Sequence, residues 1–427
     1  MTTKRATMRG NRNYPSMLDP DPVEKPIRLG LVGLGRRSRN VTMFTTQYAE
    51  YKLTAVCDLR PELVQKVAAT LDQENNLKVR GYTDFDQMLK SEELDAVAIL
   101  VDPDRQVPLT CRALEAGIHV MAEVPLCYSI EDCWQLVTTV ERTGKIFLLM
   151  EQARYGGIHR AWRRIVQKGV IGRPLFVEGE YFHYIPVMFY QDRLGRYILP
   201  EQAKNDPQAR PTWRHRRPSI GYLPHELSPL LYVLDDRVTR VTGMSTRKSR
   251  YEYPQIEHAD FQAALMHTEK DAVLRMATAF SVPHSPRGEP GICHWYHIKG
   301  TEGALEAPRA PGEKSKLWVE DWHLTEPLHV PWTYRRNDAP PEAASRGTVD
   351  WIITCSPTSP TPCCTAIRWN STCIVRWRRR RRRYWRRGRS KRTIGRLTCR
   401  TLGRGRTASR GNGRKDKTEH RTSNIEH

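Results

Sequence analysis

The fold is decided by Ile27-Arg-Leu-Gly-Leu-Val-Gly-Leu-Gly-Arg-Arg-Ser38, a short segment near the start of the chain. Its first six residues are mostly apolar and predict a buried strand. Gly33 and Gly35 then allow a tight turn and a close approach of the backbone to a bound group. Ser38 stands where a third glycine is usual, and a small residue fits that position. A strand that passes through such a turn into a helix predicts a phosphate-binding site.

A second strand and an acidic residue complete the pattern. Residues 53–57 form an apolar run that ends at Asp58, about 20 residues after the turn, as a dinucleotide site requires. A carboxylate there binds ribose hydroxyls and repels a 2′-phosphate, which favours NAD over NADP, although Arg60 keeps NADP open. We therefore predict a nicotinamide dinucleotide site whose turn and strand-end residues are Gly33, Gly35, Arg36, Arg37, Ser38 and Asp58.

The rest of the first 150 residues alternates strands and helices. Strands are expected at 95–101, 119–122 and 146–150, and helices at 61–71, 109–116 and 130–143. Gly117 and Gly144 are suited to end the last two helices. Short β-rich runs alternating with helices are typical of a buried parallel sheet. Residues 25–150 are thus predicted to form a doubly wound Rossmann domain of the α/β class.

The pattern changes after Met150. One helix is expected at 159–167, followed by longer runs of strand character at 175–184, 240–245, 260–266, 272–280, 294–299 and 316–322. These runs predict a C-terminal α+β domain, residues 151–345, with an open, mainly antiparallel sheet. His294 and His297 lie three apart on one strand and face opposite sides of the sheet, so we expect no metal site there.

Charge is concentrated at the end of the chain. Of 69 Lys and Arg residues, 22 follow Gly347, against four of the 47 acidic residues. The functional interpretation is a nucleic-acid-binding arm, with the run Arg378–Arg383 contacting phosphates. The interpretation that we favour is a frameshift near 344–347, because GC-rich DNA in a wrong frame yields Arg, Pro, Ser, Cys and Trp. Residues 346–427 are predicted to be a disordered tail, with nucleic acid a partner only if that tail is genuine.

No apolar stretch approaches the roughly 18 residues of a membrane helix. Residues 1–24 are basic without an apolar core, so they predict a disordered leader rather than a signal peptide. We expect a cytoplasmic protein with no membrane partner.

The segment Ala113-Leu-Glu-Ala-Gly-Ile-His-Val-Met-Ala-Glu-Val-Pro125 resembles the signature of the Gfo/Idh/MocA oxidoreductases, which ends in Glu-Lys-Pro. Further matches follow in order at 143–144, 170–174 and 300–305. The resemblance implies a nicotinamide-dependent enzyme that acts on a sugar or cyclitol. It also implies a role for Glu123 at the nicotinamide, and a homo-oligomer formed through the C-terminal sheet.

Two departures from the family pattern bear on the chemistry. Val124 replaces the signature lysine, and Gly221 occupies the position, four residues before His225, where the family commonly has Asp. A simple alcohol dehydrogenase needs a group that takes the hydroxyl proton. Valine cannot ionise, so this chain must supply the proton acceptor from elsewhere.

One branch of the family also carries Glu-Val-Pro, namely the NAD-dependent glycosidases resembling α-N-acetylgalactosaminidase. Other segments that resemble this branch are Met150-Glu-Gln152 with Tyr155, Glu178–His183, Trp213-Arg214 and Tyr222-Leu-Pro-His-Glu-Leu-Ser-Pro229. Glu226 and Ser228 replace two glycines of the branch. The resemblance implies that Gln152 lies at the cofactor and that the catalytic residues are His225, Tyr222, Tyr181 and Glu123.

The sequence is compatible with three functions. The first is an NAD(P)-dependent oxidoreductase that transfers hydride at a C–OH of a sugar or cyclitol. The second is a glycosidase that oxidises its substrate, eliminates the aglycone, adds water and reduces the product. The third is a non-catalytic NAD-binding protein with a basic nucleic-acid-binding tail.

Overall fold

The structure, a computed structural model, describes residues 25–47, 51–247, 259–282, 294–310 and 312–330. The chain divides into two compact units, Met1–Arg383 and Tyr384–His427, and every described residue belongs to the first. The predicted leader 1–24 and the predicted tail 346–427 lie outside the described residues.

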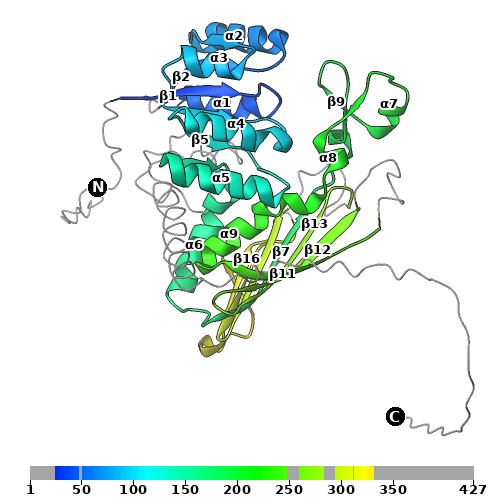
Figure 1. The fold of residues 1–427 in the computed structure, drawn as a ribbon. Coiled ribbons are helices and arrows are strands. Elements are labelled where there is room, and N and C mark those ends of the chain that lie inside the picture. The colour runs from blue at the N-terminus through cyan, green and yellow to red at the C-terminus, as the bar shows by residue number, and fades with distance from the viewer. Residues whose placement is uncertain (1–24, 48–50, 248–258, 283–293, 311, 331–427) are drawn as a thin grey trace, which may run out of the picture. The chain divides into compact units, whose positions relative to one another are not determined.

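A six-stranded parallel sheet with helices on both faces forms the N-terminal part of the unit (Figure 1). In chain order its elements are β1 Ile27–Val32, α1 Ser38–Gln47, β2 Tyr51–Cys57, α2 Pro61–Asn75, β3 Arg80–Tyr82, α3 Phe85–Ser91, β4 Ala96–Ile99, α4 Pro103–Glu115, β5 His119–Ala122, α5 Ile130–Thr143 and β6 Phe147–Leu149. The strand order β3-β2-β1-β4-β5-β6 is that of a Rossmann fold, which confirms the predicted class.

The sheet is buried because its strands are apolar on both sides. In β4, Ala96 and Ala98 pack into one core with Leu29 and Leu31 of β1. Residues 97 and 99 of the same strand pack into a second core that contains residues of α3, α4 and α5. Burial on both faces explains why the sequence shows continuous apolar runs rather than alternation.

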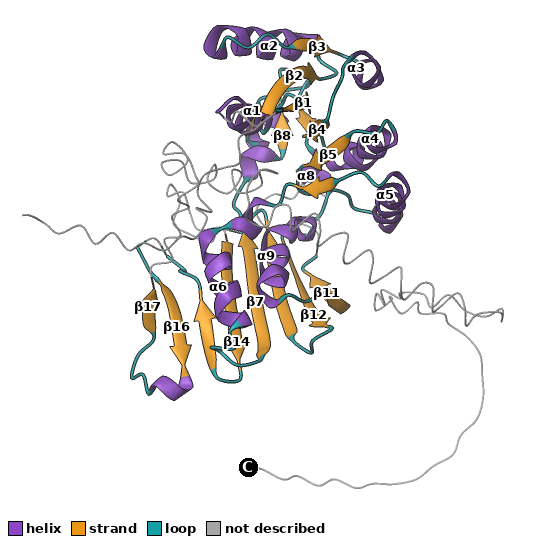
Figure 2. Ribbon diagram, turned by 90° about the vertical axis from the view of Figure 1, so that its left-hand side faces the viewer, coloured by secondary structure: helices purple, strands orange, loops and turns teal. Residues whose placement is uncertain are grey.

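An eight-stranded sheet forms the C-terminal part. Its elements are α6 Gly157–Gln167, β7 Pro174–Phe182, α9 Pro224–Leu234, β11 Val238–Ser245, β12 Phe261–Thr268, β13 Val273–Ala279, β14 His294–Gly300, β15 Gly303–Glu306, β16 Ser315–Val319 and β17 Leu328–Val330. The strand order is β11-β12-β13-β7-β14-β15-β16-β17, and only the β7–β13 pair of this described sheet is parallel. Helices α6 and α9 cover one face (Figure 2). The predicted mainly antiparallel sheet is confirmed.

Some element boundaries differ from the prediction. The helix expected at 109–116 begins at Pro103, with Pro108 inside it. The strand expected at 316–322 ends at Val319, and Glu320–Trp322 is a single 3-10 turn. The smaller elements that the sequence pattern did not reveal are β8 Tyr190–Gln191, β9 Tyr197–Ile198, α7 Pro200–Lys204, β10 Arg210–Pro211 and α8 Trp213–Arg216, with short 3-10 turns at Gln152–Tyr155, Pro186–Met188 and Ser219–Tyr222. Strands of two residues leave no periodicity to detect.

Among the described residues, no helix has the length and apolar character needed to cross a membrane.

A buried histidine makes the stability of this fold depend on pH. His159 of α6 is 0% exposed, its Nδ1 lies 2.7 Å from the Ala153 carbonyl oxygen, and its ring packs edge-on against Tyr296. Burial lowers the pKa of His159 from 6.5 to about 3. The unfolded chain therefore binds a proton that the folded chain excludes, so stability is lost as pH falls from about 6.5 towards about 3.

We expect the free energy of unfolding to fall by up to about 1.4 kcal/mol per pH unit from this residue within that window. Urea unfolding at several pH values measures the slope. The variant His159→Asn keeps a donor for the Ala153 carbonyl but does not titrate, so its slope should be shallower. Equal slopes in the two proteins would show that His159 is not the group responsible.

Candidate active site

The turn after β1 is shaped to leave space at its surface. Gly33 has φ +89°, and a Cβ there would lie 2.7 Å from the Leu100 carbonyl oxygen, so only glycine fits without strain. A Cβ added at Gly35 would meet no atom of the described residues within 4 Å. Ser38 is buried at the start of α1, and its hydroxyl donates to the Gly35 carbonyl oxygen at 2.6 Å. The turn thus presents open backbone beside a helix N-terminus, which suits a pyrophosphate.

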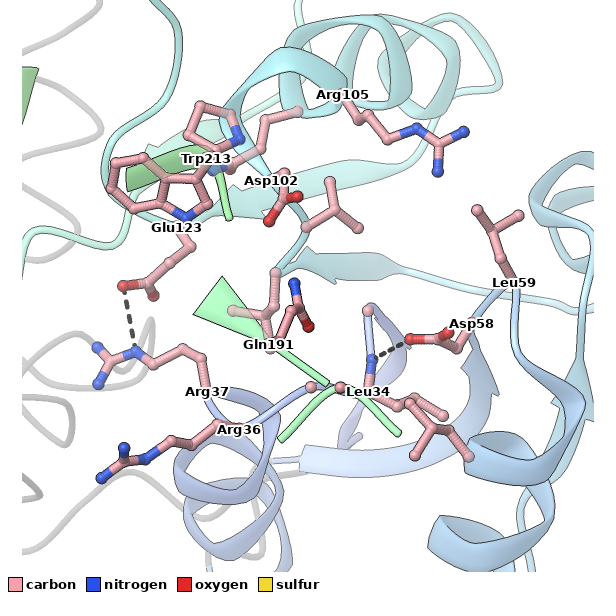
Figure 3. Close-up of a pocket in the computed structure, with 18 of the residues that line it drawn as sticks. Leu34, Arg36, Arg37, Asp58, Leu59, Asp102, Arg105, Glu123, Gln191 and Trp213 are labelled. Atoms are coloured by element: carbon pink, nitrogen blue, oxygen red, sulfur yellow. Dashed lines mark hydrogen bonds and ion pairs between the residues drawn. The ribbon is translucent and has the colours of Figure 1, made fainter. Parts of the chain in front are cut away.

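The carboxylate of Asp58 is fixed beside this turn (Figure 3). It accepts hydrogen bonds from the backbone N–H of Leu34 at 2.8 Å and of Arg60 at 3.0 Å. These bonds join the end of β2 to the glycine turn. The predicted ribose ligand therefore lies next to the predicted phosphate site, with its carboxylate held in place before any nucleotide binds.

Arg37 links three segments that are far apart in the sequence. Its Nε lies 3.1 Å from Glu123 Oε1, and another guanidinium nitrogen donates to Gln152 Oε1 at 2.8 Å. Figure 3 shows Arg37 and Glu123 pointing toward each other. Burial raises the pKa of Glu123 despite Arg37, and Glu123 Oε2 has no hydrogen-bond partner in the described part of the chain. Arg36 is exposed and lines the cavity described below, together with Arg37 and Glu123.

His225 lies in the first turn of α9 and pairs with a buried carboxylate. Its Nδ1 is 2.8 Å from Glu151 Oε2, while Glu151 Oε1 accepts from the Ala153 N–H at 2.9 Å. Burial alone would lower the pKa of His225, but Glu151 and other nearby carboxylates outweigh it and raise the pKa. The pairing fixes the imidazole and leaves Nε2 as the nitrogen that can serve a substrate.

Glu151 supplies the carboxylate that the family pattern places before this histidine. A side chain at Gly221 would overlap the ring of Tyr128, so aspartate does not fit there without rearrangement. Glu151 follows β6 instead and approaches His225 from the Rossmann side. The sequence does not reveal this pairing, because the two residues are far apart in the chain, although Glu151 belongs to a segment that resembles the glycosidase branch.

The two predicted catalytic tyrosines lie close together. The rings of Tyr181 and Tyr222 have centroids 5.3 Å apart, and each lies within 5.4 Å of the His225 ring. The Tyr222 hydroxyl accepts from Arg214 at 3.0 Å, yet burial outweighs this cation and raises the pKa of Tyr222. A phenol with a raised pKa keeps its proton and acts as a hydrogen-bond donor, so His225 is the better base.

Tyr181 has a histidine partner of its own. Its hydroxyl lies 2.7 Å from Nδ1 of His183, and burial lowers the pKa of His183 to about 4. His183 is therefore neutral near pH 7. Trp213 stacks on Tyr222 with ring centroids 5.5 Å apart, which holds the hydroxyl of Tyr222 in position.

A second acid–histidine pair lies beside the first and was not among the predicted site residues. His294 Nδ1 is 2.6 Å from Glu226 Oε1, and Glu226 is completely buried. The pKa of Glu226 is raised well above its usual value by burial. Two features of the sequence point to this pair. Glu226 replaces a glycine of the glycosidase branch, and His294 is the first residue of its expected strand.

One cavity brings these groups together. It is lined by the glycine turn, Asp58 and Arg60, by Glu123, Val124 and Gln152, and by Tyr181, His183, Arg214, Tyr222, His225 and His294. The nucleotide-binding turn and the acid–histidine pairs therefore open into the same space. A Rossmann sheet and an open sheet that share such a cavity define a dinucleotide-dependent oxidoreductase class.

Comparison with protein families agrees with this class. Residues 27–151 match the oxidoreductase family with an NAD-binding Rossmann fold, and residues 159–306 match the GFO/IDH/MocA C-terminal domain. The chain belongs to the Gfo/Idh/MocA oxidoreductase family, as its motifs predict.

Curated relatives bear the name of a glycosidase family. A "Glycosyl hydrolase family 109 protein 1" from Shewanella sp. (strain MR-4) is 28% identical over 66% of this chain and 63% of its own length. A "Glycosyl hydrolase family 109 protein 2" from Phocaeicola vulgatus is 26% identical over 68% of this chain and 72% of its own. For the relative from Shewanella sp. (strain ANA-3), the match spans about half the relative's length, 49%.

Solved structures share the fold. An oxidoreductase from Agrobacterium radiobacter in complex with NAD+, L-tartaric acid and magnesium superposes with a TM-score of 0.60, at 15% identity over 82% of this chain and 89% of its own. The WlbA dehydrogenase from Chromobacterium violaceum, in complex with NADH and UDP-GlcNAcA, gives 0.56 at 20% identity over 73% and 81%. A myo-inositol 2-dehydrogenase from Lactobacillus plantarum gives 0.53 at 17% identity over 66% and 76%.

Proposed function

We propose that the chain is an NAD-dependent glycoside hydrolase in which one sugar carbon is oxidised and reduced again within a single turnover. The observation that carries this is Val124, which lines the cavity, is 3% exposed and cannot ionise where the family signature has lysine. The curated relatives named glycosyl hydrolase family 109 support the same conclusion. The substrate class is a carbohydrate with an O-linked aglycone.

The residues present fit a nicotinamide dinucleotide. The open backbone at Gly35 suits the pyrophosphate, Asp58 suits the adenosine ribose, and the buried unpartnered Oε2 of Glu123 suits a polar group at the nicotinamide end. When bound, the dinucleotide supplies a reversible hydride acceptor that turns a ring hydroxyl into a ketone and so acidifies the neighbouring C–H.

The side chains of the cavity then handle the protons. His225, held by Glu151, takes the proton of the reacting hydroxyl at Nε2. Tyr222, which keeps its own proton, donates a hydrogen bond to the substrate, and Arg214 orients it. Tyr181 contacts both Tyr222 and His183, and it binds a substrate hydroxyl next to the reacting one.

The segment that joins β8 to β9 lies at the adenosine side of the proposed site. Residues 191–197, which run from the end of β8 to the start of β9, line the same cavity as Asp58 and Arg60. At Gly195, φ is +74°, and a Cβ there would overlap the guanidinium of Arg60. The segment thus approaches Arg60 at the adenosine side of the proposed site. We infer that it slows release of the dinucleotide, which suits a cofactor that is not consumed.

NAD rather than NADP is the proposed cofactor, because a 2′-phosphate would meet the fixed carboxylate of Asp58. We expect Asp58→Ser to shift the ratio of NADP to NAD affinity by about tenfold or more towards NADP, since about 1.4 kcal/mol of repulsion corresponds to a factor of ten. Calorimetric titration with both dinucleotides measures the shift. Arg60→Ala serves as the control, which should weaken NADP only, and an unchanged ratio in Asp58→Ser would count against the assignment.

A net dehydrogenase acting on a sugar or cyclitol is the second candidate. Its support is that Glu226 and Ser228 stand where the glycosidase branch has glycines, so the chain departs from that branch directly after His225. Its chemistry would use the same His225–Glu151 pair. A non-catalytic NAD-binding protein would bind the dinucleotide without either reaction.

One assay separates the three. The purified full-length protein is incubated with p-nitrophenyl glycosides, including the α-N-acetylgalactosaminide, with and without added NAD. Release of p-nitrophenol without accumulation of NADH supports the glycosidase. Stoichiometric NADH without p-nitrophenol supports the dehydrogenase, and retention of NAD with neither product supports a binding protein.

We further propose a homo-oligomer formed through the sheet face that α6 and α9 leave uncovered. Strand register places Met244, Leu265 and Val273 on that face, where they are 78%, 55% and 40% exposed. Light scattering tests this proposal, and a monomer at micromolar concentration would contradict it. A cytoplasmic location stays a prediction.

A further inference from the structure

The Glu226–His294 pair joins α9 to the floor of the cavity. Glu226 follows His225 directly in α9 and is 0% exposed, and its Oε1 lies 2.6 Å from His294 Nδ1 on β14. Its other carboxylate oxygen, Oε2, has no hydrogen-bond partner among the described residues. A completely buried carboxyl group with one unsatisfied oxygen is costly for the fold, so its presence calls for a function.

The fold makes room for this carboxyl group. Gly179 of β7 faces α9, and a Cβ there would lie 2.9 Å from the Glu226 Cβ. A glycine in the middle of a buried strand commonly marks such a close approach. The pair therefore depends on three elements, α9, β7 and β14, rather than on one exposed side chain.

His294 and His225 line the cavity from different sides. Their ring centroids are 5.7 Å apart and their planes are nearly perpendicular, at 87°. His225 is held by Glu151 from the Rossmann side, whereas His294 lies on the sheet and faces Tyr181 at a centroid distance of 5.1 Å. Both histidines line the cavity. Two imidazoles at this spacing can serve two neighbouring carbons of one sugar ring.

The proposed reaction needs two proton acceptors, because one proton comes from a hydroxyl and one from the adjacent carbon. We propose that Glu226 and His294 form a second proton-transfer pair, which rests on the proposed glycosidase function, with His294 as the catalytic base for the carbon and Glu226 as its positioning residue. His225 serves the hydroxyl. The geometry assigns one acid–histidine pair to each proton.

The protons balance over one turnover. His225 gains a proton as the hydroxyl carbon is oxidised to the ketone. His294 then takes the proton of the adjacent carbon, the electrons of that C–H bond form a C=C bond, and the glycosidic C–O bond breaks. The leaving oxygen takes the proton of His225. Water then adds to the former glycosidic carbon and returns a proton to His225. His294 gives its proton back to the adjacent carbon. Finally, His225 protonates the ketone oxygen as the ketone is reduced to the hydroxyl.

The test uses the full-length protein with bound NAD and p-nitrophenyl α-N-acetylgalactosaminide, or the panel member that it cleaves, in deuterated water. Three quantities are followed, namely transient reduction of the nicotinamide, release of p-nitrophenol, and deuterium at the carbon next to the oxidised one. For His294→Asn we expect p-nitrophenol release and deuterium incorporation to fall by about 100-fold or more, while transient reduction persists. Glu226→Gln keeps a hydrogen-bonding partner for His294 that cannot exchange a proton with it, and should lower the same two rates by a smaller factor.

His297→Asn is the matched control. His297 lies on the same strand, and its Nδ1 is 2.9 Å from Glu178 Oε2, but it faces away from the cavity. This variant should keep all three readouts at the wild-type level.

Three results would overturn the assignment. The His294 variant could match the wild type in all readouts, or it could lose nicotinamide reduction together with the other two, or His297→Asn could show the same losses. A wild type that reduces the nicotinamide without releasing p-nitrophenol or exchanging carbon-bound hydrogen would overturn the glycosidase function and the second pair together. Failure of the pair alone is therefore distinguishable from failure of the proposed function.

Discussion

Replacement of His225 by asparagine is expected to lower turnover by two to four orders of magnitude. General acid–base catalysis contributes about 10² to 10⁴ in rate, and His225 is the only described imidazole held by Glu151 at the cavity. Asparagine occupies a similar volume but cannot take a proton. Because the hydrogen bonds that fix the glycine turn and Asp58 do not involve His225, NAD binding should be retained.

The measurement is turnover on the cleaved glycoside, together with the NAD content of the purified variant. Glu151→Gln is the companion variant, since glutamine can still hydrogen-bond His225 Nδ1 but no longer raises its pKa. In its pH–rate profile, the acidic limb, on which activity is lost as His225 becomes protonated, should shift to lower pH. A fully active His225→Asn would require a different base and would contradict the site described above.

Replacement of Gly35 by valine is expected to abolish NAD binding without destabilising the protein. No atom of residues that the structure describes lies within 4 Å of a Cβ built at Gly35, so the folded chain accommodates the new side chain, which would then occupy the space proposed for the pyrophosphate. We expect an affinity loss of at least about 100-fold, equivalent to about 2.7 kcal/mol. The free energy of unfolding measured without NAD should change by less than about 0.5 kcal/mol.

Thermal unfolding with and without NAD measures both effects. The wild type gains about 2.7 kcal/mol at 100 times the dissociation constant, and the Gly35→Val variant should lose this gain. Gly33→Ala is the contrasting variant, because its Cβ meets the Leu100 carbonyl and its φ is positive, so it should destabilise the protein even without NAD. A Gly35→Val protein that still binds NAD normally would place the pyrophosphate elsewhere.

The nucleotide side of the molecule was predictable from sequence because its determinants are local. The strand, the turn at Gly33 and Gly35 and the helix after Ser38 are contiguous, and Asp58 follows at a spacing that the parallel β1–β2 pairing imposes. Hydrophobic periodicity likewise predicted the long strands of both sheets. The short strands near Tyr190 and Tyr197 were missed because two residues carry no period.

The catalytic side was only partly predictable, because its contacts join distant segments. The resemblance to the glycosidase branch pointed to His225, Tyr181 and Tyr222, and the structure brings these side chains together. It did not indicate that Glu151 holds His225, nor that Glu226 reaches His294 across 68 positions. The Glu226–His294 pairing follows from how α9 packs on β7 and β14, and the Glu151–His225 pairing from how α9 packs against the 3-10 turn Gln152–Tyr155; no linear spacing encodes either.

The central claim is that the nicotinamide is recycled within one turnover. The most direct measurement uses a glycoside substrate that carries deuterium on the carbon to be oxidised, with mass spectrometry of the released sugar and of the nicotinamide. A recycled cofactor predicts that the sugar keeps its deuterium on that carbon while the aglycone is released and no reduced nicotinamide accumulates. Deuterium found stoichiometrically on free reduced nicotinamide, with an oxidised sugar as the product, would contradict the account and establish a net dehydrogenase.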